Sequence, residues 1–533
     1  MREIRIRVFD EGRIDRKLTE IAKDIAKFCM EKYKLELTDI DFYLVDAEEL
    51  YSIVASRGWM VHPQHWTLGQ EYLIQKKAHE LGYWQIYEIV IPSGVWEDDL
   101  REPTQAFIYR GDTLVDIKLV MAHVFGHVHM FEKNWKLREF RPKSPYGFMS
   151  RIRDRIAQIE QMVGEDELER IMDIGYSMAN LLIDLYPTDT IEHHKDIEIS
   201  EEFFISPEEK RKKIIEKREG IIKAKEFPEK RDYDVLKFIA TYSPKLRDWE
   251  KEVLYMIWES ARYIYSWALV RILGEGFAAL VDLKYCLDAK LPIGETFEWL
   301  KHRTRGTYQP GSCKECAHRT IHISPYWLGM NLLLYIMEKW DTGRIGFEYE
   351  NIKDAIERRG YDIKLGRGWD KVLEVVATNT DYTFIDKYFT EEFFRERANF
   401  LFVYAGDEPK DGEREEDTYT IISRQYKDVK NTLLFRAYNA GMPRIAVEKG
   451  GGNYNNRGEL FLVHDISGYE SLGIRPEQLT LHPNKTIEVL LKVLYASWGR
   501  PVYLKTVDRQ GKPIILKTEN GEKVEKVEVS GSR

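Results

Sequence analysis

Three histidines, His123, His127 and His129, stand close together in the apolar stretch MAHVFGHVHM. On an α-helix four residues advance about 400°, so His123 and His127 lie one turn apart and can share one metal ion. A zinc protease carries a glutamate directly after the first histidine, whereas this chain has Val124 there. The spacing therefore favours a metal site over a protease site, and the alternative is a pair of core histidines bonded to backbone carbonyls.

Two acids in a second apolar segment, RILGEGFAALVDLKYC, could complete this site. Glu275 and Asp282 are about two helical turns apart, so on a continuous helix both carboxylates point the same way. Carboxylates on an apolar face are costly unless they pair or coordinate. In the alternative, Glu275 only accepts a hydrogen bond from a buried histidine, or the glycines on either side of it break the helix. The predicted site suits zinc first, and also iron or manganese, with the ligands His123, His127, Glu275 and Asp282.

Two functions are compatible with such a site. An ion held by His123, His127 and Glu275 would lower the pKa of a bound water, which is the chemistry of a hydrolase or amidase. His129 and Asp282 are candidates for the catalytic base by position only. The alternative is a non-catalytic regulatory or scaffold protein in which an ion only holds helices together. An open coordination position favours the enzyme, and a closed site with four protein ligands favours the structural role.

A second group of zinc-competent side chains occurs in CKECAHRTIH. Its C-x-x-C half has the spacing of a zinc knuckle, but the histidines follow too closely for a C₂H₂ finger. A reducible cysteine pair or two unrelated thiols are the alternatives. The residues of this group are Cys313, Cys316, His318 and His322.

The surrounding sequence indicates an α+β fold: a mainly α-helical large domain with a small strand pair, followed by a small α+β C-terminal domain. Residues 15–34 carry an apolar stripe of helical period, and 150–186, 246–292 and 324–404 also have helical character. The β-prone runs YEIVI and TQAFIYRGD predict a strand pair before the histidines. After residue 417, β-like runs surround one helix, Thr486–Trp498.

Charge and turn residues predict the domain boundaries. The charge-dense segment SPEEKRKKIIEKREGIIKAKEFPEKRD is interpreted as a solvated helix or linker, and AGDEPKDGEREED as a boundary. The expected segments are an N-terminal helical lobe with the H-x-x-x-H segment, a charged linker or helix, a second helical lobe that completes the core, and the C-terminal domain. Their bounds are 1–205, 206–232, 233–404 and 405–533.

The composition excludes several classes of protein. With 533 residues, 43% of them hydrophobic, the chain can bury a sizeable core. Its net charge of −9 argues against nucleic acid as the main partner, because binding phosphates demands a basic surface. We find no run approaching the roughly 20 apolar residues of a membrane span, no apolar secretion signal, and too few cysteines for a disulfide scaffold. We therefore expect a cytoplasmic protein without a membrane partner.

Several blocks of the sequence, in order, resemble the stage V sporulation protein R (SpoVR) family. The resemblance implies a role more than a reaction: spore cortex formation in spore formers and, elsewhere, association with a serine protein kinase and a von Willebrand A-like protein encoded nearby. It thus implies these two proteins as partners and a stress or sporulation pathway. The matching blocks are HWTLGQEY, YEIVI, LVDIKLVMAHVFGH, DVLKFI, GEGFAAL, SPYWLGMNLL, NYNNRGELFLVH and WGRPVYLKTV.

The chain also departs from the family pattern, which indicates a divergent member. The family usually reads AHVYGHxDFFKNN and NEGWASYWH, so an aspartate and a histidine have exchanged places at His129 and Asp282. We hypothesise that these two side chains touch, so that the exchange keeps their interaction. This requires the helix to end near Val128, because His129 otherwise lies about 200° from His127.

Overall fold

The computed structural model describes residues 4–56, 64–80, 88–92, 102–142, 144–182, 227–305, 323–406, 419–466, 485–508 and 511–528. The chain forms two compact units, each made from two stretches. The first unit is Met1–Ser150 with Val270–Lys430, and the second unit is Arg151–Leu269 with Asn431–Arg533. The contiguous domains expected at 1–205, 206–232, 233–404 and 405–533 stay a prediction, and residues 206–226 of the expected linker lie outside the described residues.

The first unit begins with a five-stranded sheet built from β1 (Ile6–Asp10), β2 (Arg13–Ile14), β3 (Ile40–Val45), β4 (Glu88–Ile91) and β5 (Thr104–Tyr109). Its strand order is β2-β1-β3-β5-β4. Strands β1, β3 and β5 run parallel, and β2 and β4 pair antiparallel at the edges. The strand pair predicted before the histidines is confirmed as β4 and β5, whereas the other three strands were not predicted.

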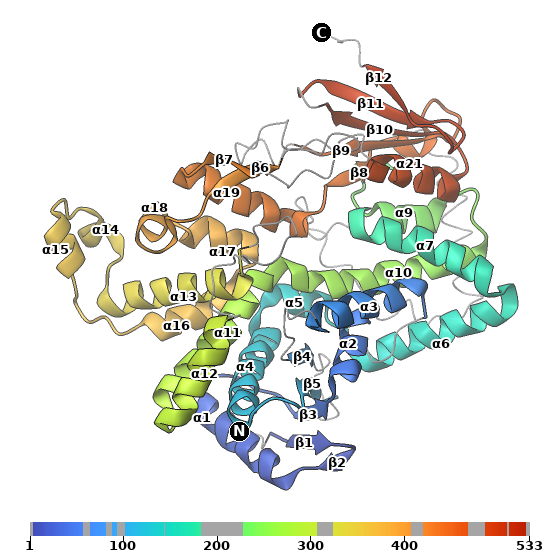
Figure 1. Ribbon diagram of the computed structural model, residues 1–533. Helices are drawn as coiled ribbons and strands as arrows, with labels where there is room; N and C mark the ends of the chain where they lie inside the picture. The colour runs from blue at the N-terminus through green and yellow to red at the C-terminus, as the bar shows by residue number, and fades with distance from the viewer. Residues whose placement is uncertain are drawn as a thin grey trace. The chain divides into compact units, whose positions relative to one another are not determined.

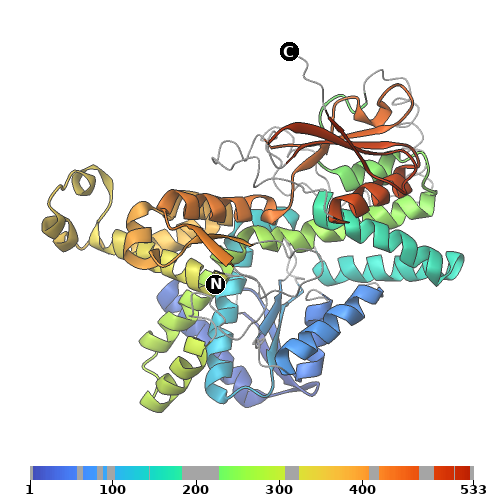
Figure 2. The same ribbon diagram turned by 45° about the horizontal axis from the view of Figure 1, so that its top comes forward.

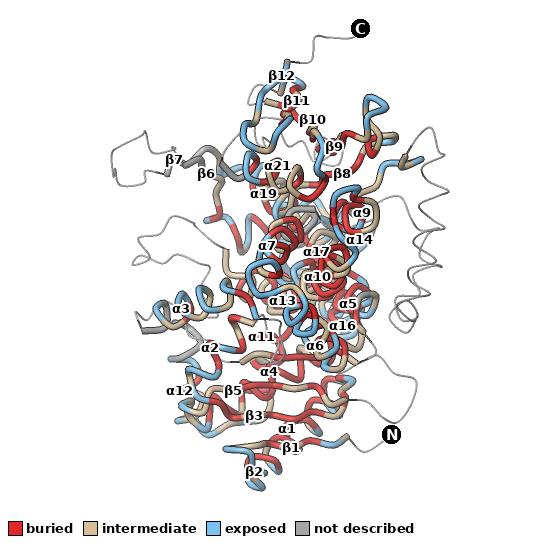
Figure 3. Tube along the Cα trace, turned by 90° about the vertical axis from the view of Figure 1, so that its right-hand side faces the viewer, coloured by how far each residue is buried: buried red, intermediate tan, exposed pale blue. Residues whose placement is uncertain are grey.

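Helices cover this sheet: α1 (Arg16–Tyr33), α2 (Ala47–Ala55), α3 (Trp66–Glu80) and α4 (Leu114–Lys133). Helix α1 packs against β1 and α4, α4 also contacts β4 and β5, and α2 packs against β5 and α3. The amphipathic helix predicted at 15–34 is confirmed as α1, where the Asp15 carboxylate accepts a hydrogen bond of 2.9 Å from the Leu18 N–H. Figure 3 shows β3 and β5 buried along most of their length.

Three further helices complete the core of the first unit: α11 (Arg271–Asp288), α13 (Pro325–Thr342) and α16 (Gly368–Thr378). Helix α11 packs against both α4 and α13, and α13 packs against α16 (Figure 1). Ser324 caps α13 and Pro325 occupies its first turn. The smaller elements are α5 (Trp135–Phe140), α12 (Ile293–Arg305), α14 (Gly346–Glu350), α15 (Ala355–Gly360), α17 (Asp381–Tyr388), α18 (Glu391–Phe393), β6 (Val403–Gly406) and β7 (Tyr419–Ser423).

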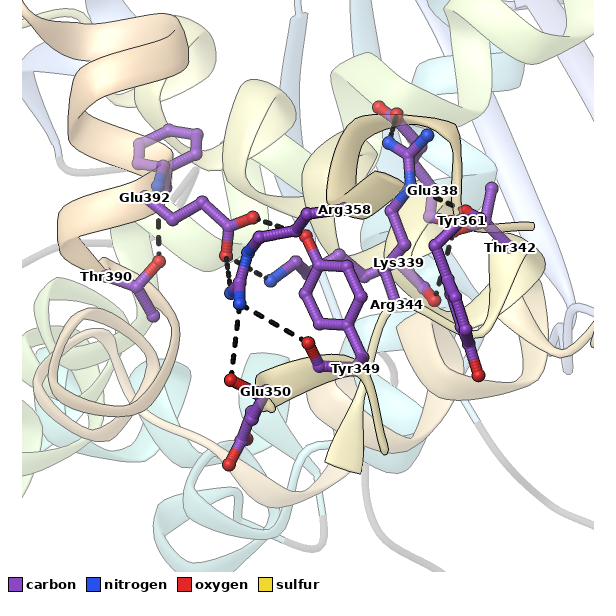
Figure 4. A network of polar contacts seen from close by, with 11 residues as sticks. Glu338, Lys339, Thr342, Arg344, Tyr349, Glu350, Arg358, Tyr361, Thr390 and Glu392 are labelled. Carbon is purple, nitrogen blue, oxygen red and sulfur yellow. Dashed lines mark hydrogen bonds and ion pairs between the residues drawn. The ribbon is translucent and has the colours of Figure 1, made fainter. Parts of the chain in front are cut away.

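Helices α14 and α15 form an arm that extends from the end of α13 (Figures 1 and 2). Polar contacts hold this arm against α13 and α18 (Figure 4). Glu392 accepts hydrogen bonds from Lys339 at 2.6 Å and from the Tyr349 hydroxyl at 2.7 Å. Arg344 donates to the Tyr361 carbonyl at 3.0 Å. The arm leaves the apolar side chains of Phe347 and Ile356 exposed, whereas Tyr349 is buried.

The second unit contains another five-stranded sheet, of order β12-β11-β10-β9-β8. Its strands are β8 (Ile445–Val447), β9 (Leu460–His464), β10 (Val502–Val507), β11 (Pro513–Thr518) and β12 (Glu525–Glu528). Helix α21 (Lys485–Trp498) packs against β10, β11 and α7 (Glu165–Leu182). The β-like runs after residue 417 and the α+β fold class are thus confirmed. The expectation of one helix there is wrong, because α19 (Tyr426–Ala437) precedes α21 in the same region. The other helices here are α6 (Pro145–Val163), which begins in the first unit, α9 (Val235–Tyr242) and α10 (Asp248–Ser266).

The helical stretches predicted at 150–186 and 246–292 are confirmed in the described residues, each with an interruption. Gly164 separates α6 from α7 and has φ +88°, a left-handed conformation that glycine adopts without steric cost. A 3₁₀ turn, Trp267–Val270, lies between α10 and α11. Each stretch therefore contains two α-helices.

His464 on β9 makes the stability of the second unit depend on pH. The residue is 5% exposed, and burial lowers its pKa to about 4, against a smaller opposite effect of Asp465. Between its ordinary pKa of 6.5 and pH 4 the unfolded chain binds a proton that the folded chain does not, so stability falls as the pH drops through this window.

We expect this histidine to remove about 2 kcal/mol of unfolding free energy between pH 7 and pH 5. Urea unfolding of the protein and of His464→Gln at both pH values measures the effect. The variant should lose less stability on acidification than the original chain. An identical loss in the two proteins would show that His464 is not the responsible group.

Two stretches of helix among the described residues are long and apolar enough to cross a membrane: Leu114–Lys133 and Asp248–Asp288. Their most apolar windows are 83% and 61% buried inside the protein. Core helices of soluble proteins pass the same test of length and composition. Neither stretch is therefore good evidence for a membrane protein.

Candidate metal centre

Helix α4 places two of the three histidines on one face. The Thr113 hydroxyl caps its start by accepting from the Asp116 N–H at 3.2 Å, and the helix continues without a break to Lys133. The ring centroids of His123 and His127 are consequently 4.9 Å apart. The prediction that these two side chains lie one turn apart on a helix is confirmed.

Helix α11 places both predicted carboxylates toward these histidines. It runs without a break through Gly274 and Gly276, so the alternative in which the glycines break the helix is wrong. The helix begins where the Asp381 carboxylate, from α17, accepts hydrogen bonds from the backbone N–H groups of Ile272 at 2.8 Å and Leu273 at 2.9 Å. This cap sets the start of α11 one turn before Glu275.

Helices α4 and α11 come unusually close beside the site. A Cβ atom on Gly126 would lie 2.7 Å from the Cα of Ala278. A side chain at position 126 would therefore push the two helices apart. Because His127 follows Gly126 directly, this close packing brings its ring toward the carboxylates of α11.

Three side chains from different parts of the chain can hold one metal ion: Glu88, His123 and His127. Their ligand atoms all lie within 4.8 Å of one another. His123 Nε2 is 3.4 Å from Glu88 Oε1, close to the separation of about 3.4 Å between two ligands of one tetrahedral zinc ion. Glu88 was missed by the sequence reasoning, although it is the second residue of the YEIVI run that precedes the histidine segment.

Glu275 lies on the same side of His123 as these ligand atoms. Its Oε2 atom is 3.5 Å from His127 Nε2 and 4.0 Å from His123 Nε2. The side chain is 24% exposed and that of His127 is 14% exposed, whereas that of His123 is fully buried. The site therefore has a closed floor at His123 and a more accessible edge at Glu275 and His127.

Asp282 contacts His123 from the opposite side of the ring. Its Oδ2 atom is 3.0 Å from His123 Nδ1, and both side chains are fully buried. The structure thus brings together all four residues of the predicted ligand set. It leaves Asp282 against Nδ1, while Glu88 and Glu275 face Nε2. Whether Asp282 binds a metal stays a prediction, and its position is that of a partner that orients the imidazole.

His129 does not belong to this site. Helix α4 extends well past Val128, so the hypothesis that the helix ends there is wrong, and with it the condition for a contact between His129 and Asp282. His129 Nδ1 instead accepts a hydrogen bond of 2.9 Å from the Glu36 backbone N–H. Burial lowers the pKa of His129 to about 4. The hypothesis that the Asp and the His exchanged relative to the family pattern touch each other is therefore not supported.

The electrostatics keep the acid at the accessible edge ionised. Burial alone would raise the pKa of Glu275, but the neighbouring His127, His123 and Arg271 outweigh burial and lower it. Tyr326, at the start of α13, lies beside the site with its ring centroid 6.0 Å from that of His123. Burial, together with the charges of Glu275 and Glu88, raises the pKa of Tyr326 well above its ordinary value. Its hydroxyl is therefore neutral at physiological pH.

The donor set fits a divalent ion. Glu88 Oε2 and Glu275 Oε2 are buried, and neither has a donor at normal hydrogen-bond geometry among the described residues. Buried carboxylate oxygens without a donor are costly, and a cation between them and the two imidazoles would remove this cost. Two imidazoles and two carboxylates suit zinc, iron or manganese equally well by ligand type.

The other predicted zinc group, Cys313, Cys316, His318 and His322, lies outside the described residues. The two cysteines within the described residues, Cys29 and Cys286, are buried and reduced. Burial raises the pKa of Cys286 to about 11 and that of Cys29 to about 12, so both thiols are unreactive at neutral pH.

Comparison with known proteins identifies the family. The family profile described as "SpoVR like protein" matches residues 14–442, which is most of the chain. The chain belongs to the SpoVR-like family. The match begins before α1 and ends after α19 (Tyr426–Ala437), so it includes every residue of the candidate metal centre. The predicted resemblance to the SpoVR family is thereby confirmed.

One curated relative is "Uncharacterized protein YcgB" of Escherichia coli (strain K12). It is 24% identical to this chain over 313 residues, which are 56% of this chain and 58% of the E. coli protein. The chain thus matches less than two thirds of that relative's length. No solved structure matches the chain.

Proposed function

We propose that this SpoVR-like protein is a metal-dependent hydrolase, with zinc as the first candidate for its metal. The observation that carries the proposal is the set of Glu88, His123 and His127, whose ligand atoms lie within 4.8 Å of one another around a buried imidazole. Three protein ligands leave a coordination position open, which is the arrangement of catalytic zinc sites. A divalent ion held there supplies Lewis acidity and a hydroxide nucleophile near neutral pH.

The chain's own residues have distinct roles in this proposal. Asp282 accepts a hydrogen bond from the Nδ1–H of His123 and so presents Nε2 toward the ligand cluster. Glu275 is at the accessible edge, is ionised, and can take a proton from a water molecule. The neutral hydroxyl of Tyr326 can donate a hydrogen bond to an oxygen on which negative charge develops.

Metal removal and restoration test the proposal. The purified protein should contain about one equivalent of zinc, iron or manganese by inductively coupled plasma mass spectrometry. Chelator treatment should abolish hydrolysis of a panel of p-nitrophenyl esters, p-nitrophenyl phosphates and peptidyl p-nitroanilides, and the native metal should restore it. A fully loaded protein that hydrolyses none of these classes would count against the enzyme.

One observation favours the regulatory alternative. Glu275 Oε2 is near enough to both histidines to act as a fourth ligand, and a site closed by four protein ligands has a structural role. In that case the family resemblance supports a cytoplasmic regulatory protein that binds a serine protein kinase and a von Willebrand A-like protein. X-ray absorption at the metal edge separates the two: a water ligand supports the hydrolase, and four protein ligands support the regulator.

A further inference from the structure

Three residues of α11 form a line from the floor of the candidate metal centre to solvent. Arg271, Glu275 and Asp282 lie within about 40° of one another around the helix axis. Asp282 is fully buried, the side chain of Glu275 is 24% exposed, and Arg271 is exposed. The accessible edge of the centre therefore continues along α11 from Glu275 to Arg271.

None of the acids around Arg271 among the described residues pairs with it. Its guanidinium group makes no hydrogen bond, and no ion pair within 4.0 Å, with the described residues. The Asp381 carboxylate is engaged by the backbone N–H groups of Ile272 and Leu273, and Glu275 Oε2 is turned toward the histidines. The positive charge of Arg271 nevertheless acts on both acids. It helps to lower the pKa of Glu275, and it opposes the effect of burial, which raises the pKa of Asp381 to about 7.

We propose that Arg271, one helical turn from Glu275 on α11, binds a carboxylate of the substrate, so that the hydrolase acts on anionic substrates. Arginine forms paired, charge-assisted hydrogen bonds with planar carboxylates. A singly charged carboxylate also suits the surroundings better than a phosphate dianion, because Glu88, Glu275 and Asp282 already contribute three carboxylates. This inference rests on the proposed function, since it assigns the substrate class of that site.

Succinate is a suitable probe, because one of its carboxylates can bind the ion while the other reaches the arginine. The zinc-loaded protein is titrated calorimetrically with succinate, acetate and inorganic phosphate. The variants are Arg271→Gln and Arg271→Lys. The control is Arg16→Gln, which removes an exposed arginine that also occupies the first position of a helix, α1.

Arg271→Gln is expected to weaken succinate binding about 10- to 100-fold, while acetate binding and zinc content stay unchanged. Arg271→Lys should recover part of the loss, and Arg16→Gln should behave like the original chain. Unchanged succinate binding in a fully zinc-loaded Arg271→Gln protein would overturn this inference and leave the proposed function standing. A larger loss for phosphate than for succinate would overturn the carboxylate assignment. Absence of zinc, iron and manganese alike from the purified original protein would instead refute the proposed function.

Discussion

Replacing His127 with alanine is expected to remove the metal, lowering its content from about one equivalent to below about 0.1. Its Nε2 atom belongs to the ligand cluster and lies 3.5 Å from Glu275 Oε2. Loss of an outer partner of a ligand already costs about 10- to 100-fold in metal affinity, and loss of the ligand itself should cost more. His127 is the better choice than His123, because it is 14% exposed and the variant should still fold.

The matched control is His129→Gln on the same helix. His129 lies on the other face of α4, where its Nδ1 atom accepts the Glu36 N–H, so its removal should leave the metal content at about one equivalent. Elemental analysis of the two variants and the original chain, each checked by circular dichroism, makes the comparison. Equal metal loss in both variants would indicate a folding defect, and full metal retention in His127→Ala would place the ion elsewhere.

The second large effect is expected for Gly276→Ala, which should lower the free energy of unfolding by about 3 kcal/mol. A Cβ atom at position 276 would lie 2.3 Å from the backbone of Gly329 on α13, and backbone cannot move aside as a side chain can. The two helices must separate, although alanine is otherwise the better helix former. Because α11 carries Asp282, whose contact with His123 Nδ1 orients that ligand, a shift of α11 should also weaken metal binding.

Gly69→Ala is the control for this substitution. Gly69 lies within α3, is exposed, and has no atom within 4 Å of the position of an added Cβ. The change should raise stability by about 0.5–1 kcal/mol through helix propensity alone. Urea unfolding followed by circular dichroism measures both variants. A Gly276→Ala protein as stable as the original would mean that α11 and α13 do not pack as closely as the structure shows.

Local patterns were sufficient to predict much of this protein. The period of the α-helix determined that His123 and His127 share a face, and that Glu275 and Asp282 share another, because these spacings depend only on the backbone geometry of one helix. The β-like runs of the C-terminal region were also recognised from composition alone. The fold class of the first unit, a mainly helical domain with a strand pair, was predicted. Strands β1 and β3 were missed because periodicity alone does not distinguish a short apolar strand from a helix.

The tertiary structure decided how these local faces meet. His123 and Asp282 are 159 positions apart in the chain, and their contact at Nδ1 depends on how closely α4 and α11 pack. Glu88 reaches the centre from the edge strand β4, which no periodicity connects to the histidines.

The sequence by itself therefore determined which chemical groups each helix presents and to which family the chain belongs. Only the tertiary structure decided the ligand set, in which Glu88 joins the histidines and Asp282 supports His123 from behind. It also turned His129 away, because α4 continues past Val128 and residues two positions apart on a helix lie about 200° apart around its axis. The physical reason is that spacing along one element is a local property, whereas contact between elements is set by the close packing of the core.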